Sequence, residues 1–374
     1  MSTTSSRART PFYEFHVEHG AKMVDFAGWE MPLLYSSIID EHRQVRSSGG
    51  LFDVSHMGRF RFIGRDACRF LDRVCTRQVH GMPERAARYG LICNEEGGCR
   101  DDVLVYRISE AEFLMVCNAA NRAKLREHFA DVRGDLVFQF KDETESTAMV
   151  ALQGPRVMEV LGRFSSEIPG LKRYRFTEKS LFTARFLISR TGYTGEDGVE
   201  VIMPAPMARQ AIGLMVTNLQ DDEGVIRPTG LGARDSLRLE AAMALYGHEI
   251  TEEIDPLSAG LNFAVKLTKG DDDPEVERFI GQAALQRIAE AGPRRILIGL
   301  QLEGRRVARQ GAAVLAGEQP VGAVTSGCLS PTLERSIAMA YVPGEHAASG
   351  SALRVDLGRQ VVEAEVVPLP FYKR

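Results

Sequence analysis

Gly97-Gly98-Cys99-Arg100-Asp101-Asp102-Val103-Leu104-Val105-Tyr106 places a Gly-Gly turn and two adjacent carboxylates directly before an apolar, β-branched run. Turn residues followed by Val, Leu and Tyr predict a strand. Because side chains alternate between the two faces of a strand, Asp102 should share a face with Leu104 and Tyr106. Asp101 should lie on the opposite face. We therefore expect Asp102 to point into an apolar layer, where a charge is costly unless it is paired or used.

This acid pair has two interpretations that the residues leave open. A carboxyl group in an apolar layer has a raised pKa, and such groups gather at functional sites. Asp is also frequent in turns for a local reason, because its side chain hydrogen-bonds the nearby backbone. The segment taken alone favours the turn interpretation.

Composition sets the class of protein. The chain has 374 residues, 44% of them hydrophobic and 26% charged, which is typical of a soluble globular protein of two or three domains. Its formal net charge is −4, whereas a general nucleic-acid-binding protein usually has an excess of Lys and Arg. No apolar run is long enough to span a bilayer, and no secretory signal is visible. We expect neither nucleic acid nor a membrane as a partner.

Metal and dinucleotide signatures are missing from the sequence. The six cysteines form no C-x-x-C pair, and the eight histidines form no H-E-x-x-H pattern. No P-loop occurs, and no G-x-G-x-x-G follows a strand. We therefore expect no metal and no flavin, and the scattered thiols indicate a reducing compartment.

The order of predicted elements indicates an α+β fold. Short strands at 59–63, 102–108 and 112–117 alternate with helical stretches at 66–74 and 121–129, after a helix at 38–46. Further on, strands are expected at 149–152, 181–189 and 199–203, and helices at 206–218 and 232–246. Gly247 would end the last of these helices.

A change of pattern marks a second domain. The polar stretch Lys269-Gly270-Asp271-Asp272-Asp273-Pro274 is the best linker candidate. Beyond Arg294 the chain is dominated by strands, expected at 296–301, 322–326, 337–341, 353–356 and 361–367. We expect a core of two intertwined α+β subdomains at 1–275 and a small all-β domain at 276–374.

Glu200 is the second candidate functional acid. It lies inside an expected strand, after the turn Thr191-Gly192-Tyr193-Thr194-Gly195-Glu196-Asp197-Gly198. A carboxylate there can accept two parallel hydrogen bonds from a planar donor pair, such as an Arg side chain or the amidine-like edge of a pterin. An edge-strand Glu that faces water is an equally good interpretation.

Arg234 lies in the first turn of an expected helix, where the helix dipole disfavours a cation. It therefore needs a partner, and either a ligand carboxylate or an internal acid would serve. The segment Leu51-Phe52-Asp53-Val54-Ser55-His56-Met57 interleaves polar with apolar residues and is a candidate pocket wall. His56 alone is more often a core histidine than a ligand.

Together these segments resemble the aminomethyltransferase of the glycine cleavage system, the T-protein family. Any one of them is a weak signal, but they run in the same order across nearly the whole chain. The matching stretches are 22–29, 51–57, Gly97-Gly98 with Asp101-Asp102, 152–155, 192–198, 230–240, and 325–327 with 330–333.

The resemblance implies a fold and a reaction. The fold is a multidomain cloverleaf of mainly antiparallel sheets with flanking helices, plus a C-terminal all-β barrel or jelly-roll-like domain. Tetrahydrofolate would lie in a central channel and accept the methylene of an aminomethyl group carried by the lipoylated H-protein. The products would be 5,10-methylenetetrahydrofolate, ammonia and dihydrolipoyl H-protein. The compartment would be the cytoplasm, or the mitochondrial matrix in a eukaryote.

The resemblance also implies roles for individual residues. Asp102 matches the essential acid, Glu200 the pterin-binding carboxylate and Arg234 a folate-site arginine. Further pocket-lining positions are Met57, Tyr89, Tyr106, Asn118 and Tyr193. The sequence departs from the family at Arg100, where an aliphatic residue is usual. Several relatives bring a basic or aromatic residue of a longer C-terminus back toward the folate. Here that contact is either missing or made by Lys373 or Arg374.

Two alternatives accompany this interpretation. Related folds act on other one-carbon donors, such as dimethylglycine or sarcosine, usually with a flavin domain that has no counterpart here. Non-catalytic folate-binding relatives carry a cysteine in a K-G-C-Y-x-G-Q motif. The comparable region here, Arg278-Phe279-Ile280-Gly281-Gln282, has no cysteine.

Overall fold

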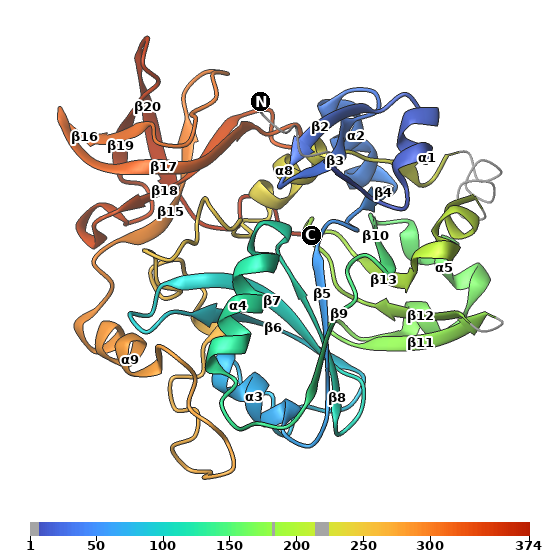
Figure 1. Ribbon diagram of the computed structural model, residues 1–374. Coiled ribbons are helices and arrows are strands. Elements are labelled where there is room, and N and C mark those ends of the chain that lie inside the picture. The colour runs from blue at the N-terminus through green and yellow to red at the C-terminus, as the bar shows by residue number, and fades with distance from the viewer. Residues whose placement is uncertain (1–6, 182–183, 214–223) are drawn as a thin grey trace, which may run out of the picture.

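The computed structural model describes residues 7–181, 184–213 and 224–374. Two large sheets and a barrel form separate lobes around a common centre, and the C-terminus returns to that centre (Figure 1). This is the α+β architecture with a C-terminal β-barrel that was predicted. The helices are α1 (Tyr13–Glu18), α2 (Ile38–Ser47), α3 (Ala67–Val74), α4 (Arg122–Val132), α5 (Val157–Phe164), α6 (Glu167–Gly170), α8 (Leu231–Glu240) and α9 (Gln282–Ala291).

The two large sheets are mainly antiparallel. The six-stranded sheet has the order β11 (Phe176–Leu181), β12 (Ala184–Ser189), β13 (Gly198–Pro204), β10 (Thr147–Gln153), β4 (Gly50–Asp53), β14 (Arg227–Pro228). The five-stranded sheet has the order β6 (Ala86–Cys93), β7 (Cys99–Arg107), β8 (Glu112–Cys117), β5 (Gly58–Ile63), β9 (Gln139–Asp142).

The remaining strands form a small sheet and the barrel. The three-stranded sheet has the order β1 (Ala8–Arg9), β3 (Trp29–Leu34), β2 (Lys22–Phe26). The barrel closes in the order β15 (Ile296–Leu302), β18 (Ser336–Val342), β17 (Gln319–Leu329), β16 (Ala313–Ala316), β19 (Ala352–Asp356), β20 (Val361–Val367). Closure removes the exposed edges that an open sheet would leave.

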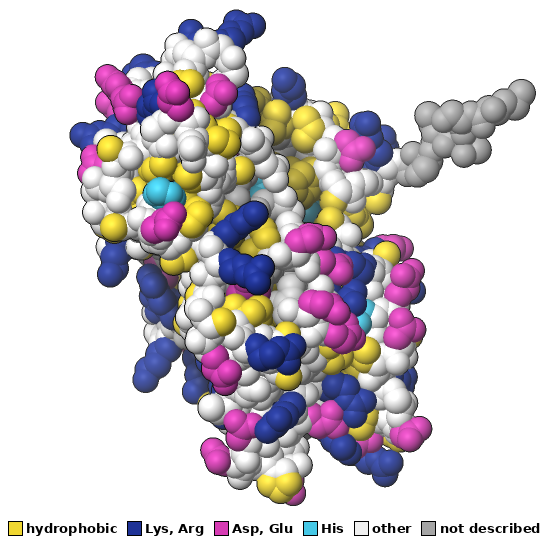
Figure 2. Space-filling model, turned by 90° about the vertical axis from the view of Figure 1, so that its left-hand side faces the viewer, with side chains coloured by type: hydrophobic (Ala, Val, Ile, Leu, Met, Phe, Trp, Pro, Cys, Tyr) yellow, Lys and Arg dark blue, Asp and Glu magenta, His cyan; other side chains and the backbone are white. Residues whose placement is uncertain are grey.

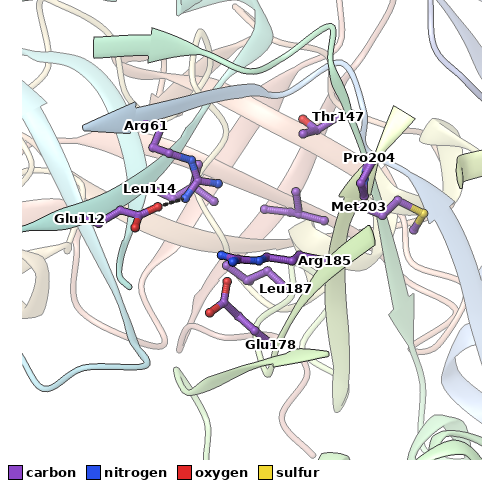
Figure 3. Close-up of a pocket in the computed structure, with 10 residues that line it drawn as sticks. Arg61, Glu112, Leu114, Thr147, Glu178, Arg185, Leu187, Met203 and Pro204 are labelled. Atoms are coloured by element: carbon purple, nitrogen blue, oxygen red, sulfur yellow. Dashed lines mark hydrogen bonds and ion pairs between the residues drawn. The ribbon is translucent and has the colours of Figure 1, made fainter. Parts of the chain in front are cut away.

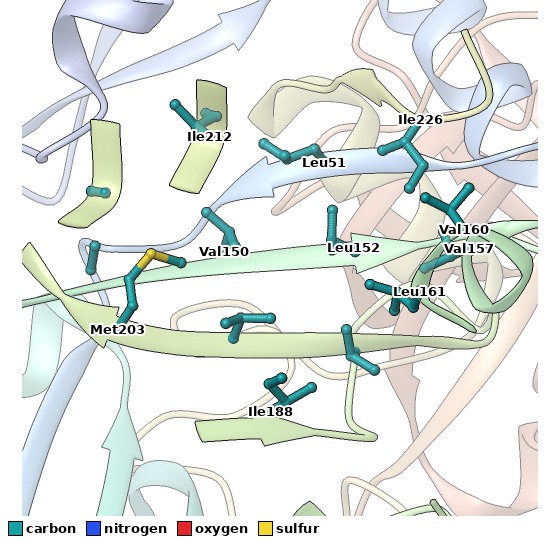
Figure 4. Close-up of a cluster of buried hydrophobic side chains, with 14 of the residues drawn as sticks. Leu51, Val150, Leu152, Val157, Val160, Leu161, Ile188, Met203, Ile212 and Ile226 are labelled. Carbon is teal, nitrogen blue, oxygen red and sulfur yellow. The ribbon is translucent and has the colours of Figure 1, made fainter. Parts of the chain in front are cut away.

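The six-stranded sheet is buried on both faces. On β10, Val150 and Leu152 pack with α5 and Ile226 in one core (Figure 4). Met149 and Ala151 alternate to the other face and enter a second core. A strand buried on both sides needs a continuous apolar sequence, which explains the run at 149–152.

The second core lies between the two large sheets and positions the site. It contains Ile202 of β13, Leu114 of β8 and Leu237 of α8. On β7, Leu104 and Tyr106 pack with this core, whereas Val103 and Val105 pack under α3 in a third core. Even-numbered residues of β7 therefore face the six-stranded sheet, and odd-numbered residues face away from it.

The expected helix at 232–246 is wrong at its end, because α8 stops at Glu240. Ala242 adopts a left-handed conformation with φ of 53°. The Met243 N–H bonds to the Arg238 carbonyl at 2.9 Å, and the Ala242 N–H bonds to the Leu239 carbonyl at 3.0 Å. These two bonds form a Schellman cap, which usually carries glycine at the left-handed position. Alanine there concealed the stop signal.

Two other expected elements include residues that lie outside the described part of the chain. The strand expected at 181–189 is interrupted, because β11 ends at Leu181 and β12 begins at Ala184, with 182–183 outside the described residues. The helix expected at 206–218 begins with a 3-10 turn at Ala205–Met207, and 214–218 lie outside the described residues.

The polar stretch at 269–274 begins with a buried residue. Lys269 is fully buried, and its Nζ lies 3.1 Å from the Asp72 carboxylate. The boundary proposed at 275/276 stays a prediction. On the face in Figure 2, side chains of both charge signs are interspersed, with hydrophobic atoms visible between them.

Candidate active site

A cavity of about 970 Å³ lies where the inter-sheet core meets α8 and the barrel. Its size suits a ligand as large as a cofactor. The predicted site residues that line it are Met57, Tyr89, Asp102, Asn118, Tyr193, Glu200 and Arg234. They come from both large sheets, from the connections between strands and from α8, and Gly327, Cys328 and Leu329 add a wall from the barrel.

Asp102 borders the cavity, on the face of β7 that was predicted. Its Oδ2 accepts a hydrogen bond from the Tyr89 hydroxyl at 3.1 Å, and its Oδ1 accepts one from Asn118 Nδ2 at 2.7 Å. Burial raises the pKa of the Asp102 carboxyl, and these two donors oppose the rise. The group is therefore a desolvated acid at the cavity wall.

Asp101 is the more buried member of the pair, which the sequence did not reveal. It is fully buried and accepts hydrogen bonds from the Asn118 N–H at 3.0 Å, Asn118 Nδ2 at 2.7 Å and Asn121 Nδ2 at 2.6 Å. Burial and the neighbouring charge of Asp102 raise the pKa of Asp101 to about 8. Strand alternation placed Asp101 on the opposite face of β7, but it could not show that this face is also buried.

Glu200 faces the cavity from the interior of its sheet. Its strand β13 lies between β12 and β10, so the interpretation as an edge-strand residue in water is wrong. The side chain is 5% exposed, and its Oε2 accepts a hydrogen bond from Thr191 Oγ1 at 2.5 Å. Burial raises the pKa of Glu200, while Thr191 and Arg234 oppose the rise. No described residue donates a hydrogen bond to the other carboxylate oxygen, Oε1, which can therefore accept one from a ligand.

Arg234 is a half-buried cation without an ion-pair partner among the described residues. Its guanidinium lies over the Tyr193 ring, 4.9 Å from the centroid. The Nη1 atom is buried and has no hydrogen-bond partner in the described part of the chain. Burial lowers the pKa of Arg234, and the nearby Glu200 opposes the change. A buried N–H group that has no partner needs a hydrogen-bond acceptor, and at a cavity wall a ligand can supply it.

His56 is a second residue at this wall that has a buried nitrogen without a hydrogen-bond partner in the described part of the chain. It is 3% exposed, lines the cavity, and its Nδ1 has no hydrogen-bond partner among the described residues. Burial lowers the pKa of His56 to about 4, so the ring is neutral near pH 7. The loop that carries it is held by the buried Arg59, which donates to the carbonyls of Ser55 and Met57. The residue is a cavity residue as well as a core histidine.

Tyr106 is not among the residues that line the cavity. It is fully buried behind the wall, packs edge-on against Phe176, and its hydroxyl lies 3.4 Å from Ser189 Oγ. It shares a strand face with Asp102 as predicted, but it lies farther along β7 in the inter-sheet core. Lys373 and Arg374 do not line the cavity either, and Arg374 Nη1 lies 3.8 Å from Glu196.

Sequence reasoning did not name two cavity residues, one in the last turn of α8 and one beyond its end. Arg238 is almost fully buried and pairs with Glu249 at 2.8 Å. A hydrogen bond to the barrel holds His248 in place, because its Nδ1 lies 2.9 Å from the Thr325 carbonyl oxygen. Both line the cavity. Arg238 lies one turn after Arg234 on the same face of α8. His248 follows the helix stop at Ala242, and only recognition of that stop could have placed it.

A smaller cavity of about 340 Å³ lies between β8 and the strands β12 and β13 (Figure 3). Arg61 in its wall is already paired with Glu112 at 2.6 Å and with Glu143 at 2.7 Å. None of the described side chains that line this smaller cavity has a buried polar atom without a hydrogen-bond partner, in contrast to Arg234 and His56 in the larger cavity. Within residues 7–181, 184–213 and 224–374, no cluster of three or more His, Cys, Asp or Glu side chains could hold a metal ion. None of the helices in those ranges combines the length and apolarity needed to cross a membrane.

Fold and site together define a ligand-binding enzyme of the α+β class, with the carboxyl groups of Asp102 and Glu200 at the wall of a large cavity. The GCVT N-terminal domain matches residues 12–269, and the glycine cleavage T-protein C-terminal barrel domain matches residues 295–373. The chain belongs to the glycine cleavage T-protein family, the aminomethyltransferases.

Relatives with solved structures or known names are similar to this chain over nearly its full length. The aminomethyltransferase of Rubrobacter xylanophilus is 48% identical, over 98% of this chain and 94% of that protein. The aminomethyltransferase of Thermotoga neapolitana is 43% identical, over 98% of both. The crystal structure of the glycine cleavage system aminomethyltransferase T from Bartonella henselae superposes with a TM-score of 0.89 at 32% identity, covering 98% of this chain and 99% of that one.

Proposed function

We propose that this chain transfers the methylene of an aminomethyl group, carried on the lipoyl arm of an H-protein, to tetrahydrofolate. The observation that carries the proposal is one cavity with Asp102 from the five-stranded sheet and Glu200 from the six-stranded sheet on its walls. The relatives come from bacteria, and we place the reaction in the cytoplasm.

The polar groups at the cavity wall fit a reduced pterin. Glu200 offers Oε1 to the planar N–H pair of the pterin edge, and Arg234 Nη1 offers an N–H to its carbonyl acceptor. The tyrosine rings and aliphatic side chains of the lining offer an apolar surface to the flat ring. In this arrangement, the ligand satisfies groups that the protein alone leaves without partners.

In the proposed reaction, the folate nitrogen is the nucleophile. New bonds join the methylene carbon to N5 and N10, and the carbon–sulfur and carbon–amine bonds break. The two protons lost from N5 and N10 end on the lipoyl sulfur and on the departing nitrogen, which leaves as ammonia. Positive charge develops on the carbon in transit, and the Asp102 carboxylate stabilises it electrostatically. The cavity holds the two large substrates in contact and so supplies much of the acceleration.

The test is incubation with tetrahydrofolate and aminomethylated H-protein. We expect 5,10-methylenetetrahydrofolate and ammonia in equal amounts, and neither product with H-protein that lacks lipoate. Folate binding without turnover would instead indicate a binding module. Turnover only with dimethylglycine or sarcosine would contradict the H-protein as donor.

A further inference from the structure

Asp101 has no contact with the cavity, yet it is joined to the acid that has one. The residues that line the cavity include Asp102 and Asn118 but not Asp101. The Asn118 side-chain nitrogen lies 2.7 Å from Asp101 Oδ1 and 2.7 Å from Asp102 Oδ1. One amide NH₂ group therefore bridges two neighbouring carboxyls, one inside the core and one at the cavity wall.

The bridge determines how the Asn118 amide is turned. Both of its N–H donors are directed to carboxyl oxygens, and the opposite orientation would place an amide oxygen against two acceptors. The backbone N–H of Asn118 also donates to Asp101, at 3.0 Å, which fixes the residue at its main chain as well. The amide oxygen of Asn118 is then the atom left for the cavity.

We propose that Asp101 is a positioning residue for the reaction proposed above, on which this inference rests: its buried carboxyl holds the Asn118 amide in the orientation that fixes the Asp102 carboxylate and turns the amide oxygen to the substrate. Asp101 acts only through Asn118 and does not touch the reacting atoms.

The charges around the pair agree with this role. The titratable groups that face Asp101 are Asp102, Cys117 and Tyr246. Burial and Asp102 raise the pKa of Asp101, and the donors of Asn118 and Asn121 oppose the rise. Burial also raises the pKa of Asp102, and Asn118 and Tyr89 oppose that rise. Asn118 therefore favours the charged form of both carboxyl groups.

The variant Asp101→Asn tests the proposal. Asp101 accepts three N–H donors on two oxygens, whereas an asparagine has one oxygen and would oppose one donor with another. With the oxygen of the new side chain at the place of Oδ1, its NH₂ group faces the backbone N–H of Asn118. We expect this opposition to displace Asn118, so that Asp102 loses a hydrogen bond that lowers its pKa. We expect kcat to fall about tenfold or more with a KM for tetrahydrofolate within about threefold. The acidic limb of the pH profile should move to higher pH.

A matched control separates positioning from stability. Asp142→Asn removes a carboxylate of the same sheet that holds Arg122 at 2.7 Å and does not line the cavity. It should lower Tm while kcat and the pH profile stay at wild-type values. The proposal is overturned if Asp101→Asn has the wild-type pH limb, or if its loss of kcat merely follows Tm as in the control.

A second measurement needs no turnover and keeps the two proposals distinguishable. Infrared titration follows the protonated-carboxyl absorption that disappears in Asp102→Asn. We expect this absorption to persist to higher pH in Asp101→Asn than in the wild type. If the wild type forms no methylenetetrahydrofolate, the proposed function fails, whereas an unshifted titration overturns the role of Asp101.

Discussion

At the scale of single residues, the charge of Asp102 is the feature most sensitive to change. Asp102→Asn keeps the shape of the side chain and removes the carboxylate at the cavity wall. Loss of one electrostatic group aimed at a transition state costs about 100- to 1,000-fold in kcat. We expect a loss of that size, with tetrahydrofolate binding and Tm nearly unchanged. Turnover near the wild-type rate would show that the acid has no catalytic part.

Glu200 should govern affinity rather than rate. Glu200→Gln replaces one acceptor oxygen with a donor that opposes the pterin N–H groups. Because hydrogen bonds to charged groups contribute roughly 1.5–3 kcal/mol, we expect the Kd for tetrahydrofolate to rise on the order of tenfold to a hundredfold. Isothermal calorimetry measures this change. Glu178→Gln, on β11 at the smaller cavity, is the matched control and should bind as the wild type does.

Strand alternation predicted the face of Asp102, and the family resemblance predicted that Asp102 and Glu200 belong to one site. Both side chains line the same cavity. The residues alone left a turn role for Asp102 and an edge-strand position for Glu200 open. Strand alternation predicts which face of the strand a side chain occupies, but not whether that side chain reaches the cavity. Tyr106 shares the face of Asp102 and still lies behind the wall. The bridge through Asn118 joins two strands, and no local pattern encodes such a contact.

At the scale of elements, Glu240 joins α8 to α2 and to the barrel. It pairs with Arg46 at 2.9 Å and His42 at 3.1 Å, and it accepts a hydrogen bond from Thr332 Oγ1 at 2.8 Å. Burial alone would raise the pKa of Glu240, but these contacts, above all His42, lower it from 4.5 to about 2. The carboxylate therefore stabilises the assembly of the three elements.

The lowered pKa predicts a loss of stability in acid. The unfolded chain binds this proton near pH 4.5 and the folded chain only near pH 2, so the contribution is complete above pH 4.5 and disappears as pH falls to about 2. A shift of this size corresponds to on the order of 3 kcal/mol. We expect Glu240→Gln to lower Tm at pH 7 and to flatten the dependence of Tm on pH between 5 and 2. Parallel Tm curves for the two proteins would contradict this.

Elements were predictable where the local pattern and the tertiary structure agree. The strands at 112–117 and 361–367 have their predicted bounds, because turn residues flank a single apolar run. The end of α8 was not predictable, since alanine occupies the left-handed position of its cap. There the packing of the cavity wall overrides the local preference for helix.

At the scale of the whole molecule, ligand binding should couple the three lobes. Tetrahydrofolate that binds only the folded state adds about 2.7 kcal/mol of stability at a hundred times its Kd. We expect a rise in Tm and slower amide hydrogen exchange in the cavity walls of both sheets and of β17. Glu200→Gln at the same ligand concentration should show a smaller rise. Protection confined to one lobe would mean that folate does not occupy the shared cavity.

The walls of the large cavity come from segments as distant in the chain as Val24 and Pro331. A growing polypeptide on the ribosome therefore completes this cavity only when almost all of the chain has been synthesised. We expect the proposed folate ligand to occupy the whole cavity only in finished molecules.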